Sequence, residues 1–370
     1  MTRINGLLLA FISFFLQGMT LVAAQNPVYP EWKTNTEKRS INLKDLLTPG
    51  VTKDGIPAID RPRFVSVKAA SKWLSDNEPV IALQVNGVNR AYPLQILIWH
   101  EIVNDQIGGV PVIVTYCSIC NSAIVFERKL GRRILSFGIA GFVHGSNMVM
   151  YDRETESWWQ QFTGEAIVGD LLGMKLKPIP AQMISFAQFA KAFPNGQTLS
   201  RQTGFVRDYG SNPHFRYDNL EGRPSHFRGK PDSRLIPMEK VIGVEIGDKA
   251  KAYPYAISRA RRVIYDRIGE QEMVIFHADG ALSALDETDM KKSKPAGSTG
   301  VFEPFINGRR LTFGYQDGEF VDAETGSRWN ISGKAISGKM QGKSLKRIAH
   351  GDYFAFAWLA FKPKTEIFTQ

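Results

Sequence analysis

The chain has 370 residues, of which 43% are hydrophobic and 22% are charged, and its formal net charge is +10 at pH 7. A chain of this length buries enough surface to fold without disulfide bonds. Its basic residues are scattered rather than gathered in an arm, and no nucleic-acid-binding motif accompanies them, so we expect no nucleic-acid partner.

The N-terminus has the pattern of a secretory signal peptide. Arg3 is followed by an apolar run from Leu7 to Leu16, and small residues stand at Ala23 and Ala24. This pattern predicts cleavage near Ala24 and a periplasmic or secreted mature protein. Polar residues interrupt the run before it reaches the roughly 20 apolar residues of a membrane span, and no later segment is apolar enough. We therefore expect no transmembrane segment in the mature chain.

Two long stretches of the chain resemble each other. VIALQVNGVNRAYPLQILIWHEIVND at 80–105 is echoed by VIGVEIGDKAKAYPYAISRARRVIYD at 241–266. Further along, DRETESWW at 152–159 is echoed by DAETGSRW at 322–329. The spacing of 161 to 170 residues is far longer than that of solenoid repeats, so it indicates a duplicated domain.

Each copy has mainly the pattern of β-strands. Val, Ile, Phe and Tyr alternate with polar residues between Gly, Asn and Asp turns, whereas the segments after AYP and at 186–193 are typical of short helices. We predict an α+β, strand-rich fold of two tandem copies of one domain, the second degenerate at the site. The predicted organisation is a signal peptide at 1–24, an N-terminal extension at 25–78, a first repeat at 79–202, a linker at 203–235 that is rich in turn residues, and a second repeat at 236–370.

The copies share the string D-x-E-T-x-S-x-W, which looks catalytic at first sight. It persists in the second copy, which has no cysteine. We therefore interpret it as structural, with Asp152 and Thr155 closing a turn and Trp159 anchoring the core.

The stretch VTYCSICNSA at 114–123 holds the two cysteines of the chain, Cys117 and Cys120. In the alignment of the copies they stand opposite His277 and Gly280, so the second copy lacks them. A disulfide across so short a loop contributes only about 2 kcal/mol in the chain-entropy model, which is a weak reason to keep it as a staple. One close thiol pair in a large exported protein therefore indicates redox or metal chemistry.

Three more polar residues are specific to the first copy. His100 and Glu101 align with Arg261 and Arg262, and His144 lies in a short insertion that the second copy lacks. Because these residues and the cysteines belong to the first copy alone, we expect His100 and Glu101 to lie beside the two thiols.

Three motifs, in order, resemble a bacterial and archaeal family of proteins of unknown function, DUF3179. They are WHEIVND, VTYCSICNSA and MYDRETESWWQQ, and the resemblance extends over most of residues 60–365. Ser118 stands where the family has proline, and Asn121 where it has glycine. Some relatives carry selenocysteine in the second motif, so the resemblance implies a redox-active or metal-ligating chalcogen. The residues that match the family motifs are His100, Glu101, Asn104, Asp105, Cys117, Cys120, Asp152, Arg153, Trp159 and Gln160.

The leading interpretation is a thiol redox centre, and hence a candidate thiol-dependent oxidoreductase, whose thiol or disulfide partner the sequence does not identify. Cysteines at this spacing interconvert between dithiol and disulfide. A protonated His100 would lower the pKa of a neighbouring thiol, and Glu101 would orient the imidazole or accept a proton. We expect Cys117 to be the more nucleophilic cysteine and Cys120 to resolve the mixed disulfide.

Two other interpretations stay open. In the first, Cys117, Cys120 and His100 bind copper or zinc, with His144 as a fourth ligand. In the second, the protein is a non-catalytic envelope scaffold whose thiols are incidental. No cofactor is certain from the sequence, and copper or zinc follows only from the first of these.

Overall fold

The fold is taken from a computed structural model, which describes residues 31–369. The chain divides into two compact units, residues 1–33 and 34–370, and every helix and strand described below belongs to the second. The predicted signal peptide at 1–24 lies outside the described residues. With 41% strand and 12% helix, the structure confirms the strand-rich expectation. No helix of the described residues is long and apolar enough to cross a membrane.

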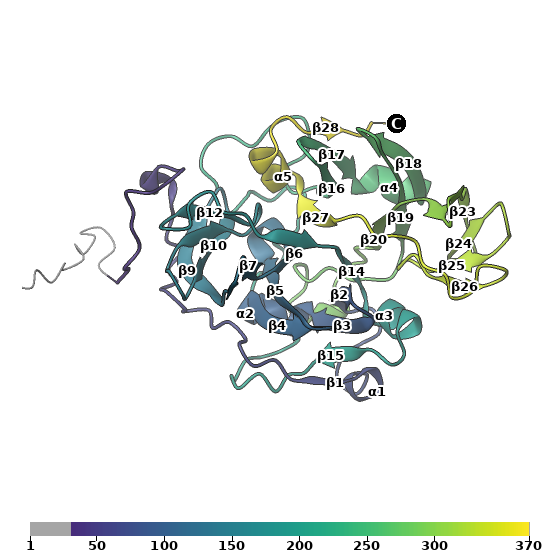
Figure 1. The fold of residues 1–370 in the computed structure, drawn as a ribbon, viewed down its shortest axis with the longest axis horizontal. Helices are drawn as coiled ribbons and strands as arrows, with labels where there is room; N and C mark the ends of the chain where they lie inside the picture. Colours follow the sequence, from purple (N-terminus) through teal and green to yellow (C-terminus); the bar gives the residue numbers. More distant parts are fainter. Residues whose placement is uncertain (1–30, 370) are drawn as a thin grey trace, which may run out of the picture. The chain divides into compact units, whose positions relative to one another are not determined.

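The first half of the second unit contains three sheets, a small hairpin and short helices, drawn from blue to teal in Figure 1. The strands of the first sheet are, in spatial order, β1 (Phe64–Ser66), β15 (Gln197–Leu199), β3 (Val88–Pro93), β2 (Pro79–Val85) and β14 (Ala181–Ser185). The second sheet consists of β13 (Lys177–Ile179), β6 (Ser122–Glu127), β5 (Val110–Cys117) and β4 (Ile102–Ile107). The third consists of β12 (Glu165–Val168), β11 (Trp158–Gln160), β10 (Asn147–Asp152) and β9 (Phe137–His144). The other elements are the hairpin β7 (Lys129–Leu130) and β8 (Arg133–Ile134), the α-helices α1 (Val67–Ala70), α2 (Leu94–His100) and α3 (Phe186–Ala192), and the 3-10 helices η1 (Leu43–Asp45) and η2 (Ser118–Cys120).

The second half, drawn from green to yellow, has a similar set of elements. The strands of its first sheet are, in spatial order, β27 (His350–Phe354), β16 (Lys240–Ile246), β17 (Lys249–Pro254) and β28 (Glu366–Ile367). The second sheet consists of β18 (Val263–Ile268), β19 (Gln271–Ala278) and β20 (Ser298–Phe302). The third consists of β23 (Phe313–Gln316), β24 (Glu319–Asp322), β25 (Arg328–Trp329) and β26 (Ala335–Ser337). The other elements are the hairpin β21 (Phe305–Ile306) and β22 (Arg309–Arg310), the helices α4 (Tyr255–Arg261) and α5 (Ala355–Phe361), and the 3-10 helix η3 (Met290–Lys292).

The two halves contain the same series of strand pairings. Strands β14, β2, β3 and β15 lie side by side in the first half, as β27, β16, β17 and β28 do in the second. In both sets the first two pairings are antiparallel and the last is parallel. The series β4, β5, β6 has its counterpart in β18, β19, β20, and β9 to β12 have theirs in β23 to β26.

The strand register corrects the alignment of the cysteines by one residue. The backbone N–H of Tyr116 donates to the carbonyl of Glu101, and the N–H of His277 donates to that of Arg262, both at 2.9 Å. Tyr116 therefore corresponds to His277, and Cys117 to the next residue, Ala278. The offset of 161 residues that relates 80–105 to 241–266 gives the same correspondence when it is continued through β5 without a gap.

The two halves share their hydrophobic core. The largest cluster of buried side chains includes the cysteine strand of the first half and Phe354, Phe356 and Trp358 of the second. Hydrogen bonds also join the halves: the Asn121 amide donates to the Asp352 carbonyl at 3.2 Å, and the Gln182 amide to the Thr299 carbonyl at 3.0 Å. Unfolding either half therefore exposes core surface of the other.

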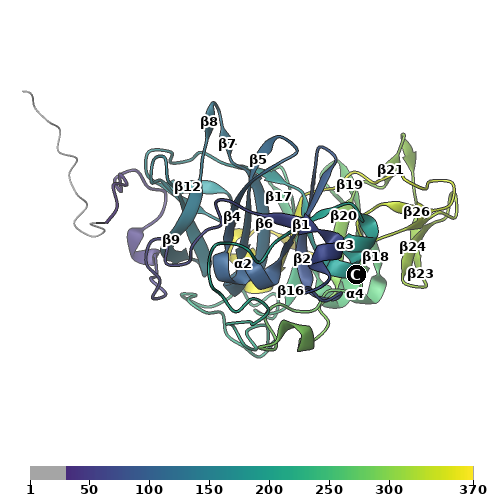
Figure 2. The ribbon, with the colours of Figure 1, turned by 90° about the horizontal axis from the view of Figure 1, so that it is seen from below.

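Strand β5 and helix α2 place the WHE and TYC segments next to each other. Every residue of β5 after Val110 is buried, as expected for a β-branched run in the middle strand of a sheet. Helix α2 contacts β4 and β5 (Figure 2). It ends at His100, because Glu101 adopts a left-handed conformation with φ of 56° that turns the chain into β4.

The shared D-x-E-T-x-S-x-W string is structural, as predicted. In the first half the Asp152 carboxylate accepts hydrogen bonds from the backbone and hydroxyl of Thr155, and from the indole of Trp159 at 2.8 Å. In the second half Asp322 accepts the same bonds, including one from Trp329 at 2.8 Å. The carboxylate closes a turn, and the buried indole holds that turn against the core.

We predict that Trp159→Phe and Trp329→Phe each lower the free energy of unfolding by about 2 to 4 kcal/mol. Each removes the indole donor of a buried carboxylate and leaves a small cavity. Urea denaturation measures both, and each variant serves as the control for the other. A Trp159→Phe variant with normal stability and impaired thiol chemistry would contradict the structural role.

Candidate functional site

The two cysteines lie at the turn between β5 and β6. Cys117 ends β5, Cys120 ends the 3-10 helix η2, and both are free thiols with 0% of their surface exposed. Asn121 follows in a left-handed conformation with φ of 50°. Asparagine and glycine both tolerate this conformation, so the departure of Asn121 from the family pattern leaves the turn intact.

Hydrogen bonds to sulfur favour a thiolate at Cys120. Its Sγ lies 3.0 Å from both the Asn147 amide nitrogen and the Ser122 hydroxyl. Burial alone would raise the pKa of Cys120, but hydrogen bonds with Cys117, Ser122 and Asn147 outweigh that effect and lower it. Burial raises the pKa of Cys117, and so does its hydrogen bond to Cys120. The lower pKa of the pair thus belongs to Cys120, whereas the sequence analysis expected Cys117 to be the more nucleophilic cysteine.

Asn147 is itself held by two glutamines of the third motif. Its amide nitrogen also donates to Gln161 at 2.7 Å, and its oxygen accepts from Gln160 at 2.6 Å. His144 bonds to the oxygen of Gln160 at 2.8 Å. His144 is therefore linked to Cys120 by successive hydrogen bonds through Gln160 and Asn147, and it does not contact the sulfur as a ligand would. Gln161, which the sequence analysis passed over, also accepts a hydrogen bond from Ser122 at 2.8 Å.

Glu101 lies close to Cys117. Both residues line the same cavity, and the charge of Glu101 contributes to the raised pKa of the Cys117 thiol. The Glu101 carboxyl has no hydrogen-bond partner among residues 31–369, and burial raises its pKa to about 8. At neutral pH it is therefore mainly a neutral acid, able to donate a proton.

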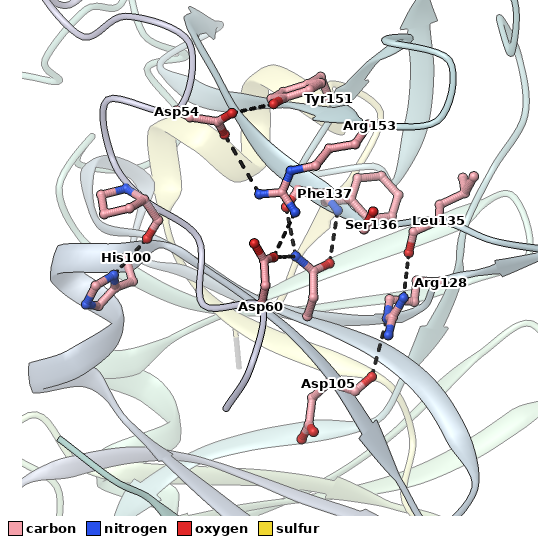
Figure 3. Close-up of polar contacts among 12 residues, drawn as sticks. Asp54, Asp60, His100, Asp105, Arg128, Leu135, Ser136, Phe137, Tyr151 and Arg153 are labelled. Carbon is pink, nitrogen blue, oxygen red and sulfur yellow. Dashed lines mark hydrogen bonds and ion pairs between the residues drawn. The ribbon is translucent and has the colours of Figure 1, made fainter. Parts of the chain in front are cut away.

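His100 contacts other partners than the thiols. Its Nδ1 bonds to the Pro57 carbonyl at 2.7 Å (Figure 3). Its Nε2 bonds to the Tyr209 hydroxyl at 2.6 Å. Burial lowers its pKa, so it does not supply the positive charge expected beside the thiols. Successive helical residues point about 100° apart, so Glu101 and His100 at the end of α2 reach different surroundings. His100 joins the N-terminal extension to the 203–235 segment.

A cavity of about 200 Å³ lies beside Cys117. Its walls are mainly apolar, and its polar groups are the Cys117 thiol, the Glu101 carboxyl, the Ser118 hydroxyl and two imidazoles. The residues that line it are Pro49, Val51, Ile56, Ile98, Glu101, Cys117, Ser118, Ile119, Ile139, Gly141, Phe142, Val143, Met148, His214 and His226. The arrangement brings a thiol, a neutral acid and two histidines to one small apolar space.

The 203–235 segment covers the cysteine turn. It has no helix or strand, yet the Tyr217 hydroxyl donates to the Ile119 carbonyl at 2.9 Å, and His214 bonds to the Ser118 hydroxyl at 2.9 Å. The segment also supplies His214 and His226 to the cavity. Sequence reasoning treated it as a linker and missed both histidines. The available signal was composition, because two of the six histidines of the chain lie in it.

Other residues of the family motifs hold the N-terminal extension in place. Asn104 donates to Asp60 at 2.8 Å, and Arg153 forms an ion pair with the same carboxylate at 2.8 Å. Tyr151 donates to Asp54 (Figure 3). These contacts anchor residues 54–60, which include Ile56 of the cavity wall and directly follow its Pro49 and Val51.

The ligand set of the metal interpretation is dispersed. His100 and His144 are hydrogen-bonded elsewhere, as described above. Among residues 31–369, no group of three or more His, Cys, Asp or Glu side chains is arranged to hold a metal ion.

The model of a family described as protein of unknown function, DUF3179, matches residues 53–365. The match includes both halves, the 203–235 segment and the extension that forms a wall of the cavity. No curated protein and no solved structure matches the chain. The chain thus belongs to the DUF3179 family of proteins of unknown function.

Proposed function

We propose that the protein is an exported thiol redox protein in which Cys117 and Cys120 cycle between dithiol and disulfide. The observation that carries the proposal is that two free, fully buried thiols lie next to each other at one turn, with the Asn147 amide donating to the sulfur of Cys120. Two cysteines three residues apart in one turn form a disulfide with little backbone movement, and the cysteine whose pKa is lowered supplies the reactive thiolate of such a pair.

We also propose that the two halves are copies of one domain and that the second has lost the chemistry. The strand pairings that the two halves share support this. So does the residue at the position of Cys117, which is Ala278 in the second half. The second half then serves as scaffold: its core packs against the cysteine strand, and Asp352 holds Asn121 of the turn.

The proposal predicts a reversible two-electron couple in the purified protein. After reduction and unfolding, the wild type shows two reactive thiols; after mild oxidation it shows none, and a dithiol reductant restores both. Cys117→Ser and Cys120→Ser each leave one thiol and form no intramolecular disulfide. Intact mass and thiol counting in denaturant measure each state, since both thiols are buried in the folded protein.

The same preparation tests the soft-metal alternative. Wild-type protein with stoichiometric copper or zinc that each cysteine substitution abolishes, and with no disulfide under oxidation, would replace the redox proposal. Ala278→Cys, made together with Cys117→Ser and Cys120→Ser, is a matched control, because it places a single thiol at the equivalent position of the second half and should form no intramolecular disulfide.

A further inference from the structure

The burial of the thiol pair beside this cavity restricts which reaction partners can reach the sulfurs. Both sulfurs are fully buried, and the turn that carries them is covered by the 203–235 segment. A disulfide of a folded protein partner cannot reach such a sulfur without displacing that cover. A small molecule can occupy the cavity itself, because an apolar protein cavity of about 150 Å³ already binds benzene, and this one has about 200 Å³.

The chemistry of the walls narrows the class of molecule. Most of the wall, including Ile98, Ile139 and Val143, offers no partner to a charged group, so a zwitterionic disulfide would lose more hydration than the few polar groups of the cavity replace. The cavity nevertheless presents a carboxylic acid with no hydrogen-bond partner among the described residues, a short way from a thiol. An apolar molecule that releases an alkoxide when a thiol attacks it fits both the apolar wall, which would bind it, and the carboxylic acid, which would protonate the alkoxide.

We propose that this cavity binds a small organic hydroperoxide and that Glu101 donates the proton to its leaving alcohol. The proposal rests on the redox function of the thiol pair and adds its oxidant. Cys117, which lines the cavity, is the sulfur that attacks, and Cys120 acts as its base.

The step balances without any further reactant. Cys117 Sγ attacks the terminal oxygen of the hydroperoxide, a sulfur–oxygen bond forms and the oxygen–oxygen bond breaks. The Cys117 proton passes to the Cys120 thiolate, and the Glu101 proton passes to the departing alkoxide, which leaves as an alcohol. Cys117 is now a sulfenic acid. Cys120 attacks its sulfur, the sulfur–oxygen bond breaks, and the hydroxide leaves as water with the Cys120 proton, so that sulfur has lost two electrons and the hydroperoxide has gained them.

Single-turnover oxidation of the pre-reduced protein by tert-butyl hydroperoxide tests the proposal, with hydrogen peroxide as the small polar comparison. We expect the ratio of the two rate constants to exceed that of free N-acetylcysteine about tenfold or more. Glu101→Gln should slow both reactions about a hundredfold, within the usual range for a general acid. Because the acid ionises with a pKa of about 8, the wild-type rate should fall above pH 8, whereas the rate of a free thiol rises.

Val51→Phe separates binding from chemistry. Val51 is a partly exposed wall residue, and the larger ring narrows the cavity. It should slow tert-butyl hydroperoxide about tenfold and change the rate with hydrogen peroxide less than about twofold. Reversible disulfide formation with a diamide oxidant, but a hydroperoxide rate no faster than that of the free thiol, would overturn this inference and leave the redox function standing. Failure to form any Cys117–Cys120 disulfide would overturn both.

Discussion

Glu101→Gln is expected to raise the free energy of unfolding at pH 8.5 by up to about 5 kcal/mol. Burial raises the pKa of Glu101 from 4.5 to about 8. Between these values the folded protein holds a proton that the unfolded chain has lost, so the stability contributed by this site falls as the pH rises from about 4.5 to 8. A shift of this size corresponds to roughly 5 kcal/mol at 1.36 kcal/mol per unit, and glutamine does not titrate.

Urea denaturation at pH 5 and pH 8.5 measures the effect. The gain should be small at pH 5, where both forms of the residue are neutral in the folded protein, and large at pH 8.5. Glu270→Gln is the matched control, because Glu270 is exposed and an exposed substitution changes stability by about 0.5 kcal/mol or less. An equal effect of Glu101→Gln at both pH values would show that the carboxyl is not held in its neutral form. A variant that is more stable and yet slower with hydroperoxide would identify Glu101 as a residue kept for chemistry.

Acidification is expected to destabilise the protein by up to about 3 kcal/mol through His277 alone. Burial, with the nearby Arg259 and Arg262, lowers the pKa of His277 from 6.5 to about 4. Between these values the unfolded chain binds a proton that the folded protein does not, so stability is lost as the pH falls from about 6.5 to 4 and levels off below. Burial also lowers the pKa of His100, His214 and His350, which adds to the slope in the same direction.

His277→Phe should therefore reduce, but not abolish, the loss of stability between pH 7 and pH 4. The ring keeps its place in the core against Tyr255, and within residues 31–369 the buried Nε2 of His277 has no hydrogen-bond partner that phenylalanine would leave unpaired. Ser258→Ala is the control: it removes the hydrogen bond to His277 Nδ1 but leaves the titration, so it should keep the slope. Thermal or urea unfolding at half-unit pH steps measures both, and an unchanged slope in His277→Phe would refute the assignment.

The family match covers the stretch that carries the three motifs, and the strand-rich composition followed from alternating β-branched and aromatic residues. The structural role of the Asp152 and Trp159 string was also predictable, because its repetition in a half without thiols separated turn geometry from chemistry. Local patterns of this kind depend on neighbours within a few residues, which the chain itself specifies.

The surroundings of the thiols depended on long-range packing. From its first-copy position His100 was expected beside the sulfurs, but its ring bonds to Pro57 and Tyr209, and the two histidines of the cavity come from residues 214 and 226. The 203–235 segment has no periodicity to predict its path, because its side-chain contacts, rather than a ladder of backbone hydrogen bonds, fix it over the cysteine turn.

The sequence by itself determined that one pair of thiols stands three residues apart at the end of a buried strand, in one half of a chain with two similar halves. Only the tertiary structure decided which sulfur has the lower pKa, because that depends on Asn147, which is 27 residues away along the chain and 3.0 Å away in space. It also decided that Glu101 is a neutral acid: a carboxyl has an ordinary pKa in any sequence, and only burial in a particular cavity raises it.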